Sequence, residues 1–336
     1  MKEMTGLMLE NFGVTVSWYG STVEAFDVII NEADKLGFGY SWVPEAWGLE
    51  AFSLVSHILS RTFHIKVGTG IVNVFSRSAA VIGMGCATLQ QIAPERFMLG
   101  LGSSGRTLVE KWHGLDFSKP LKRTEEYVKV VRKVVSGEEV EFQGEVIKSL
   151  SKFRLFTNSV QTNLEIYLGA LGDANLRLAG EIADGAILAM YPSSRLEHAM
   201  KMLSTCDGSP KKLFTYLPTV ISTSQELIEK EKRQAAKNIA FYVGSMGKYY
   251  AASLSRLGYE TEITNILEAK QDRTSKVTEY LLSDLSLIGP PKLIVEKIAK
   301  FPCDVIPVFA FSCASKDEVL SSVASMQLLS SYLRTQ

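Results

Sequence analysis

The sequence predicts an α/β protein with the (β/α)8 fold of a TIM barrel, and two observations support this fold class. Short apolar runs bounded by Gly or Pro recur along the 336 residues, and amphipathic stretches separate them. Apolar runs of this kind are typical of parallel strands that are buried on both faces. A doubly wound open sheet is the alternative, but eight units in one uninterrupted alternation favour the closed barrel.

The individual elements follow from these runs in chain order. The strands are expected at residues 5–9, 39–43, 65–69, 97–101, 164–168, 185–190, 214–221 and 304–310. The helices are expected at residues 21–36, 50–61, 77–92, 121–136, 172–183 and 290–300. The first helix has the clearest signals, because Ser21 and Glu24 form a capping box at its start and Gly37 follows its end.

Two stretches are predicted to be insertions, in addition to the strands and helices of a minimal barrel. Residues 138–158 show near-alternating β-forming residues around Gly144, which predicts a hairpin lying beside the barrel. Residues 224–288 predict a helical insertion before the eighth strand, charged at first and then rich in Tyr and Phe. Because barrel sites lie on the loops after the strands, we expect this insertion to cover the mouth of the site. The chain is then a single domain, residues 1–336.

Composition limits the classes of partner. The 36 Lys and Arg residues balance 36 Asp and Glu residues, whereas a nucleic-acid-binding protein normally shows a basic face. The four cysteines, Cys86, Cys206, Cys303 and Cys313, are scattered without a C-x-x-C motif, which predicts reduced thiols. No stretch reaches the roughly 18 apolar residues that a membrane helix needs. We expect a cytoplasmic protein without a nucleic-acid or membrane partner.

The residues at the strand ends point to a bound organic cofactor. The histidines are only His57, His64, His113 and His198, and none forms a cluster with carboxylates, so no metal site is expected. No lysine ends a strand, which disfavours Schiff-base chemistry. Glycines, small hydroxyls and aromatic residues occur there instead. Such a surface favours a planar, phosphate-bearing cofactor that brings its own chemistry.

Two glycine-rich loops are candidate phosphate sites. In "GALGDAN" a strand ends at Gly169, the chain turns through Gly172, and a helix begins near Asp173. Free N–H groups at such a helix start attract phosphate, although a simple tight turn explains the glycines equally well and Asp173 suits a helix cap. "GLGSSG" adds Ser103 and Ser104 as donors, with a plain glycine turn as the alternative.

The third strand is interrupted by glycine. In "KVGTGIVNV" Gly68 and Gly70 stand where a buried strand would pack side chains, and Asn73 follows at once. Glycine inside a strand marks a bulge or the close approach of another group.

Together these segments resemble the luciferase-like monooxygenase superfamily, and within it the branch that uses the deazaflavin coenzyme F420, that of methylenetetrahydromethanopterin reductase. The resemblance covers about residues 5–205 and the eighth strand. It is carried by VPEAWGLEAF (43–52), VGTGIVNVFSRSAAV (67–81), PERFMLGLGSSG (94–105), KWHG (111–114) and YLGALGDANLRLAGEIADGAIL (167–188).

The resemblance implies how the cofactor is held. It implies a non-prolyl cis peptide at Gly70–Ile71 that presses on the central ring, with Asn73 and Glu45 flanking that ring. It implies that the phosphate-bearing tail runs to the glycine loops. The residues implied there are Gly102, Ser103, Ser104, Gly169, Ala170, Leu171, Gly172 and Asp173.

Catalytic and substrate residues are expected around the same rim. Glu45 is the first choice for acid–base chemistry, or else it only hydrogen-bonds the cofactor, and His113 is the second choice, with core packing as its alternative. Trp18, Trp47 and Tyr191 are expected to line the substrate pocket. Two departures from the family leave the substrate open. Met8, with Glu10 two residues on, stands where the methanopterin reductases carry a carboxylate, and Ala46 stands where the alcohol dehydrogenases carry His.

The expected function is hydride transfer between F420 and a small organic substrate at a CH–NH, CH–OH or C=C group. One alternative is an FMN-dependent two-component monooxygenase, and another is a non-catalytic flavin-binding protein of the same superfamily. The family further implies a homodimer, with residues 77–92 able to supply the interface, and a separate reductase that supplies reduced cofactor.

Overall fold

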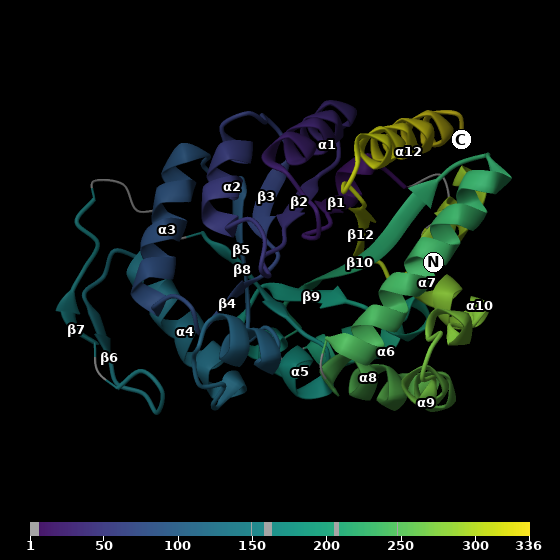
Figure 1. Ribbon diagram of the computed structural model, residues 1–336. Helices are drawn as coiled ribbons and strands as arrows, with labels where there is room; N and C mark the ends of the chain where they lie inside the picture. The colour runs from purple at the N-terminus through teal and green to yellow at the C-terminus, as the bar shows by residue number, and fades with distance from the viewer. Residues whose placement is uncertain (1–6, 149, 158–162, 205–207, 247) are drawn as a thin grey trace.

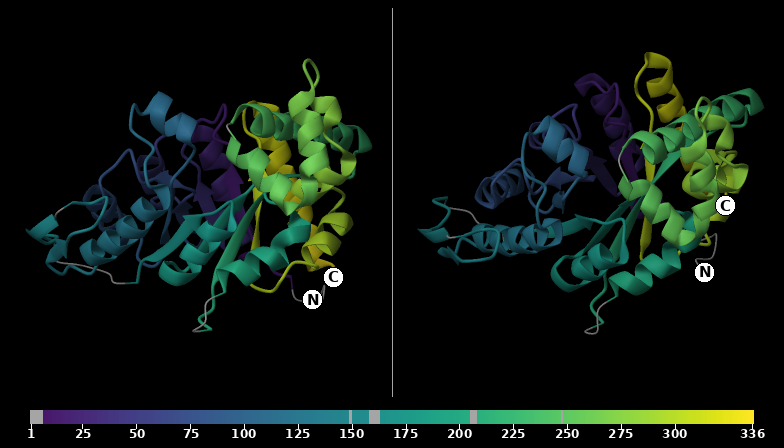
Figure 2. Two further views of the ribbon diagram at one scale, coloured as in Figure 1. Left: turned by 90° about the horizontal axis from the view of Figure 1, so that it is seen from below. Right: turned by 60° about the horizontal axis from the view of Figure 1, so that its bottom comes forward.

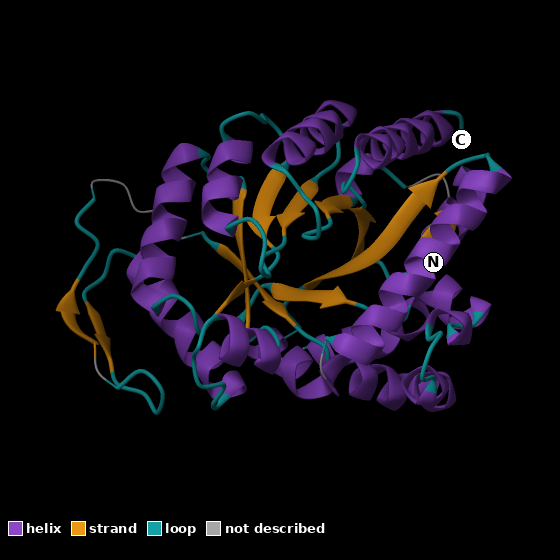
Figure 3. Cartoon of the chain, viewed as in Figure 1, coloured by secondary structure: helices purple, strands orange, loops and turns teal. Residues whose placement is uncertain are grey.

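Parallel strands close into a barrel at the centre of the computed structural model, which describes residues 7–148, 150–157, 163–204, 208–246 and 248–336 (Figures 1 and 3). Each strand pairs in parallel with the next, β9 pairs with β10, and β12 returns to β1. The TIM-barrel prediction is therefore confirmed. The barrel strands are β1 (Gly13–Val16), β2 (Tyr40–Val43), β3 (Lys66–Thr69), β5 (Phe97–Gly102), β8 (Glu165–Gly169), β9 (Gly185–Ala189), β10 (Lys212–Ile221) and β12 (Val305–Phe311).

Helices surround the strands, as Figure 3 shows. Each covers the outer face of the barrel with its apolar side, because parallel strands must be buried on both faces. These helices are α1 (Val23–Leu36), α2 (Ala51–Leu59), α3 (Ala79–Ile92), α4 (Pro120–Val135), α5 (Asp173–Ile182), α6 (Leu196–Leu203), α11 (Pro291–Ile298) and α12 (Lys316–Arg334).

The prediction of the first strand is wrong. Residues 5 and 6 lie outside the described part, Met8 is 54% exposed, and Leu9–Asn11 forms a 3-10 turn. The strand is instead Gly13–Val16, whose residues are all buried. Its Gly and Thr positions face the crowded barrel interior, where a Cβ on Gly13 would lie 3.0 Å from Val308, so the strand has a weaker apolar signal than the segment before it.

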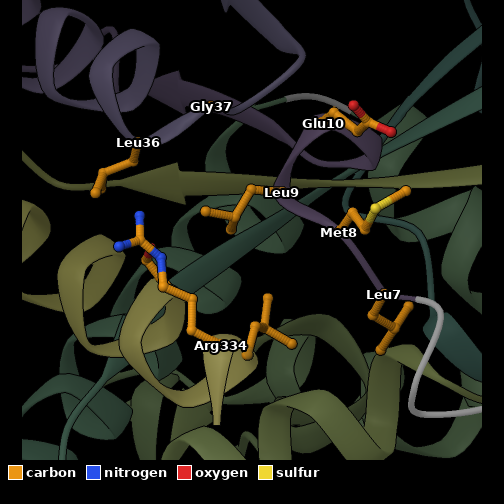
Figure 4. Close-up of a pocket in the computed structure, with 9 residues that line it drawn as sticks. Leu7, Met8, Leu9, Glu10, Leu36, Gly37 and Arg334 are labelled. Carbon is orange, nitrogen blue, oxygen red and sulfur yellow. The ribbon is translucent and has the colours of Figure 1, made fainter. Parts of the chain in front are cut away.

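The shift of the first strand also removes one comparison with the methanopterin reductases. Met8 and Glu10 lie at the amino end of the barrel, where Figure 4 shows them beside Leu36 and Arg334 around a hollow of about 310 Å³. Met8 and Glu10 therefore lie outside β1, whereas the resemblance implies a carboxylate in the middle of the first strand. The match of Met8 to that carboxylate is wrong.

Large side chains fill the inside of the barrel and explain one glycine. Trp42, Tyr167 and Phe214 meet edge to face, with ring centroids 4.8–5.5 Å apart. A Cβ on Gly68 would lie 2.6 Å from the Trp42 ring, so Gly68 makes room for the core rather than for a ligand. Gly70, one residue beyond β3, has a different environment that is described below.

The predicted cap of α1 is displaced by one residue. The Thr22 side chain accepts from the Ala25 amide, whereas the Ser21 hydroxyl donates to the Trp18 carbonyl. The Ser21–Glu24 capping box is therefore wrong. Gly37 ends the helix in the left-handed conformation at φ 93°, as the sequence predicts.

The predicted hairpin is present and stands apart from the barrel (Figure 1). It consists of β6 (Val140–Phe142) and β7 (Leu150–Phe153), which pair antiparallel. The carboxylate of Glu126 on α4 holds the connecting turn, because it accepts from the amides of Glu145, Val146 and Ile147 at 2.7–3.0 Å.

The predicted helical insertion is also present between β10 and β12. It contains α7 (Gln225–Ser245), α8 (Lys248–Leu254), α9 (Glu260–Glu268) and α10 (Glu279–Leu285), with its own apolar core. A short strand, β11 (Leu287–Gly289), then pairs with the end of β10 before α11 resumes the barrel. Figure 2 shows the insertion from two further sides.

Cys86, Cys303 and Cys313 carry free thiols, and Cys206 lies outside the described residues. No described helix combines the length and the apolar character that crossing a membrane requires.

Candidate functional site

The loops after the barrel strands bring most of the predicted site residues to one rim. The peptide bond Gly70–Ile71, immediately after β3, is cis, as the resemblance implies. The chain then forms β4 (Val72–Asn73), which pairs with the end of β5. This path carries the backbone of residues 70–73 across the mouth of the barrel between β2 and β5.

The side chain of Ile71 lies over two other predicted glycines. A Cβ on Gly102 would lie 3.3 Å from Ile71 Cδ1, and a Cβ on Gly169 would lie 3.4 Å from Ile71 Cγ2. The ends of β3, β5 and β8 therefore lie close together, with the Ile71 side chain packed against the backbone of Gly102 and Gly169. This part of the rim, Gly70, Ile71, Gly102 and Gly169, is called the glycine floor below.

Tyr216 on β10 belongs beside this floor, and sequence reasoning missed it. A Cβ on Gly70 would lie 2.2 Å from the Tyr216 hydroxyl oxygen, so only glycine leaves that hydroxyl its place. The oxygen is buried and has no hydrogen-bond partner among the described residues, and burial raises the pKa of Tyr216 well above its usual value. Because Tyr216 and Gly70 lie about 146 positions apart, only closure of the barrel brings them together.

Asn73 connects the β3 loop to the loop after β5. Its side-chain oxygen accepts from the amides of Phe75 and Ser76 at 2.9 and 2.8 Å, so its NH2 group must face the other way. That group lies 3.4 Å from Nε2 of His113, which follows a π-helical turn at Leu108–Trp112. Since an NH2 group can only donate, Nε2 of His113 must accept, and the ring proton is on Nδ1.

Glu45 is held by an ion pair. Arg77 donates to both of its carboxylate oxygens at 2.7 Å, and the Ala51 amide donates to Oε2 at 3.0 Å. The same guanidinium contacts Glu50, and its hydrogen bond to Glu45 raises the pKa of Arg77. The Glu45 side chain is only 10% exposed. A carboxylate whose two oxygens both accept from one guanidinium suits positioning of the β2 loop better than proton donation. Arg77 is a residue that sequence reasoning missed.

The predicted phosphate loop lies between β8 and α5. Gly172 is the N-cap of α5 without a side-chain acceptor, so the first amides of the helix are not capped by a side chain. Asp173 does not serve as the cap, because its carboxylate bonds Nε2 of His198 at 2.9 Å. The insertion adds Arg256, whose Nη2 would lie 3.5 Å from a Cβ on Gly172. No described side chain forms an ion pair with Arg256.

Further polar groups surround this loop. The Ser253 hydroxyl donates to the Leu171 carbonyl at 2.6 Å, and the Ala170 amide donates to the Ile187 carbonyl. Tyr191 is 1% exposed, its hydroxyl has no partner among the described residues, and burial and the charge of Asp173 raise its pKa to about 12. Ser103 and Ser104 follow β5, and Ser104 has a left-handed φ of 56°. The predicted pocket residue Tyr191 thus lies on the phosphate-loop side.

The two predicted pocket tryptophans lie on the opposite side of the rim. Trp18 after β1 and Trp47 after β2 are in contact, with ring centroids 4.2 Å apart. The Trp18 indole N–H donates to the hydroxyl of Tyr242 on α7 at 3.1 Å. Tyr242 in turn meets Tyr250 of α8 edge to face at 5.0 Å. Sequence analysis noted the aromatic stretch of the insertion, but its partners become visible only in the folded chain.

The described residues include no cluster of three or more His, Cys, Asp or Glu side chains that could hold a metal ion. The described groups at the rim are glycine backbone, hydroxyls, the His113 ring and aromatic side chains. Such a donor set fits an organic cofactor with a flat ring and an anionic tail.

Known proteins share this sequence and this architecture. The luciferase-like monooxygenase family profile matches residues 12–302. A candidate coenzyme F420-dependent oxidoreductase of Mycobacterium tuberculosis is 26% identical over 316 residues, which cover 87% of this chain and 91% of that protein. A 5,10-methylenetetrahydromethanopterin reductase of Archaeoglobus fulgidus is 26% identical over 281 residues, which cover 79% of this chain and 82% of the reductase.

A solved structure agrees with the fold. The coenzyme F420-dependent tetrahydromethanopterin reductase of Methanopyrus kandleri matches with a TM-score of 0.76 at 21% identity, covering 96% of this chain and 99% of that chain. The family profile extends from β1 to the segment before β12 and so covers all the barrel strands except β12. This chain therefore belongs to the luciferase-like monooxygenase family.

Proposed function

We propose that this protein is an oxidoreductase that uses coenzyme F420 and exchanges a hydride with a small organic substrate. The observation that carries the proposal is the glycine floor, where Gly70, Gly102 and Gly169 surround the side chain of Ile71. The missing Cβ atoms of Gly102 and Gly169 leave room for the Ile71 side chain, and a flat ring would pack on the aliphatic surface that this side chain forms at the rim. The names of the Mycobacterium tuberculosis relative and of the Methanopyrus kandleri structure include coenzyme F420, which supports the choice of cofactor.

The residues present fit such a cofactor. Two buried hydroxyls on the rim, those of Tyr216 and Tyr191, have no partner among the described residues, and buried polar groups are normally satisfied. The glycine floor would hold the ring, with Asn73 at its edge. The uncapped start of α5 and Arg256 would hold the phosphate-bearing tail, because helix N-termini and guanidinium groups both favour anions. Gly102, Ser103 and Ser104 would flank the same tail.

When bound, F420 supplies hydride exchange, in which two electrons and one proton move together to or from a substrate carbon. The chain's own residues orient the reactants and keep water out. The Nδ1–H of His113 is a fixed donor that can bond a substrate heteroatom. Glu45 acts through Arg77 to hold the β2 loop in place. The insertion, residues 224–288, covers the mouth through its contacts with Trp18 and Leu171.

A second candidate is an FMN-dependent monooxygenase that receives reduced flavin from a separate reductase, and the word monooxygenase in the family name supports its type of reaction. The glycine floor accepts a flavin ring as readily as a deazaflavin ring. A flavin-binding protein without turnover would use the same floor. Binding measurements separate the first two candidates, and turnover separates both from the third.

The decisive experiment is equilibrium binding of F420 and of FMN to the purified protein, by cofactor fluorescence and by calorimetry. We expect micromolar binding of F420 and much weaker binding of FMN. Gly102→Val, which fills the floor beside Ile71, should weaken binding, whereas Gly105→Ala should not, because no atom lies within 4 Å of its new Cβ. Preference for FMN would favour the monooxygenase function over the F420-dependent one. Failure of both cofactors to bind would refute the proposal that the glycine floor binds a cofactor ring.

The anionic tail can be tested separately. Arg256→Ala should weaken binding of either phosphate-bearing cofactor about five- to tenfold, since a charge-assisted contact contributes roughly 1–1.5 kcal/mol. Arg233→Ala removes another exposed arginine of the insertion and serves as the control. Equal effects of the two substitutions on cofactor binding would show that Arg256 acts only through the overall charge of the insertion and not through a contact with the tail.

We further propose that the protein forms a homodimer through α3. Residues 78–94 contain no charged side chain, and Val81, Met84 and Ile92 are 53%, 54% and 44% exposed. A two-fold contact places the same surface on both sides, so an uncharged helix can pair with itself without repulsion.

A further inference from the structure

We infer that the substrate of this site is an uncharged, ring-containing apolar molecule, bound on the side of the rim formed by Trp18, Trp47, Tyr242 and Tyr250. This inference rests on the proposed function, because it assigns the opposite side of the rim to the cofactor tail. It goes further by naming the chemical class of the substrate. The four residues are called the aromatic side below.

The first observation is that the described loops on this side carry no free cation. The loops after β12 and β1, residues 312–315 and 17–22, contain no charged residue. The loop after β2 contains Glu45 and Glu50, and Arg77 bridges both carboxylates. The Glu318 carboxylate at the start of α12 accepts from the Ser312 hydroxyl and the Ala314 amide. A ligand on these described loops therefore meets carboxylates that are already paired or hydrogen-bonded, and it meets no free cation.

The second observation is the aromatic contact between barrel and insertion. Trp18 is in contact with Trp47 and bonds Tyr242, and Tyr242 packs on Tyr250. Trp47 is 40% exposed, so part of its ring remains open to a ligand. Burial raises the pKa of Tyr242 and of Tyr250 above the usual value, so both phenol hydroxyls are uncharged at neutral pH.

The third observation is the contrast with the other side of the rim. After β5, β8 and β9 the chain carries Arg106, which pairs with Glu110, then Asp173, which bonds His198, and then Arg195. The insertion adds Arg256, which has no ion-pair partner among the described residues. An anionic group is stabilised there, whereas on the aromatic side it would lose hydration without gaining a cation. Burying an unpaired charge costs several kcal/mol, which exceeds what one ring contact returns.

An apolar ring on the aromatic side gains both burial and ring contacts. Apolar surface removed from water is stabilising in proportion to its area, and edge-to-face ring pairs contribute further. The geometry thus selects a neutral ring over an anion of the same shape. A cation could also contact ring faces, and a cationic probe is therefore part of the test.

The test compares three probes of similar shape, acetophenone, benzoate and benzamidinium, by saturation-transfer NMR on the full-length protein with F420 present. We expect acetophenone to bind at least tenfold more tightly than benzoate and benzamidinium. Trp47→Ala should weaken acetophenone binding about tenfold. Phe63→Ala removes another exposed aromatic ring, before β3 at the amino end of the barrel, and should have no effect.

Tyr242→Phe keeps the ring and removes only the hydroxyl that Trp18 bonds, so it should reduce acetophenone binding less than Trp47→Ala. The inference is overturned if benzoate or benzamidinium binds as tightly as acetophenone, if none of the probes binds, or if Trp47→Ala has no effect. F420 binding is read separately from the cofactor's own fluorescence. Loss of F420 binding with acetophenone still bound at Trp47 would refute the proposed function and leave the apolar subsite standing.

Discussion

The side-chain amide of Asn73 donates to Nε2 of His113 across 3.4 Å, while its oxygen accepts from the Phe75 and Ser76 amides. This arrangement places the proton of the His113 ring on Nδ1. It changes the role that the sequence predicts for His113, because Nε2 is occupied by the Asn73 amide and a ring in this tautomer carries a donor, not a base, on Nδ1.

Asn73→Asp tests this relationship directly. The carboxylate can still accept from the Phe75 and Ser76 amides, but its second oxygen would favour a proton on Nε2 of His113. We expect ¹⁵N chemical shifts to report an Nδ1–H ring in the wild-type protein and a protonated Nε2 in the variant. Asn73→Ala should lose the preference for one tautomer. A wild-type ring with its proton on Nε2 would contradict the assignment.

Arg77→Met should destabilise the protein by about 2–3 kcal/mol, since it leaves the largely buried Glu45 carboxylate without its partner. Glu45→Gln should cost less, and the double variant should lose less than the sum of the two. Urea unfolding of the four proteins measures the coupling. Additive losses would mean that the ion pair does not position the β2 loop.

The hairpin turn should loosen in acid. Burial acts to raise the pKa of Glu126, but hydrogen bonds from the Ile147, Glu145 and Val146 amides outweigh it and lower the pKa below the usual 4.5. The stabilisation is therefore present above pH 4.5 and is lost as the pH falls through the lowered pKa. Hydrogen exchange at residues 145–147 should accelerate over that range.

Glu126→Gln should produce the same loosening at neutral pH, at a cost of about 2 kcal/mol, because a neutral amide accepts these bonds more weakly. Glu125→Gln is the matched control. Its surface pairs with Lys122 and Lys129 contribute little, so the turn should exchange as in the wild-type protein. Unchanged exchange in Glu126→Gln would show that other contacts hold the turn.

Met84→Glu tests the proposed homodimer. A two-fold contact through α3 would place the new carboxylate near its symmetry mate, and we expect sedimentation to report monomers with an unchanged circular dichroism spectrum. Leu293→Glu on α11, which is 52% exposed, serves as the control and should leave the oligomeric state unaltered. If Met84→Glu sediments like the wild-type protein, α3 is not the interface.

Local patterns in the chain are sufficient for much of the fold. The strands from β2 onward, the hairpin and the helical insertion follow from apolar runs, alternation and caps, since these depend on neighbours within a few residues. The first strand was misplaced because "GVTV" has small residues where the barrel interior is crowded, while "LML" lines the amino end. Burial of a short strand depends on packing partners far along the chain.

The sequence by itself determined the barrel class, the two glycine loops and the family resemblance, and that resemblance implied the cis peptide bond that the structure has at Gly70–Ile71. Only the tertiary structure decided how these residues are used. It paired Glu45 with Arg77, set Asn73 against His113, and placed Tyr216 under Gly70. It also brought Tyr242 to Trp18 and Arg256 to Gly172. The physical reason is that hydrogen bonds, ion pairs and burial depend on distance in space, and closure of the barrel makes neighbours of residues that are far apart in the chain.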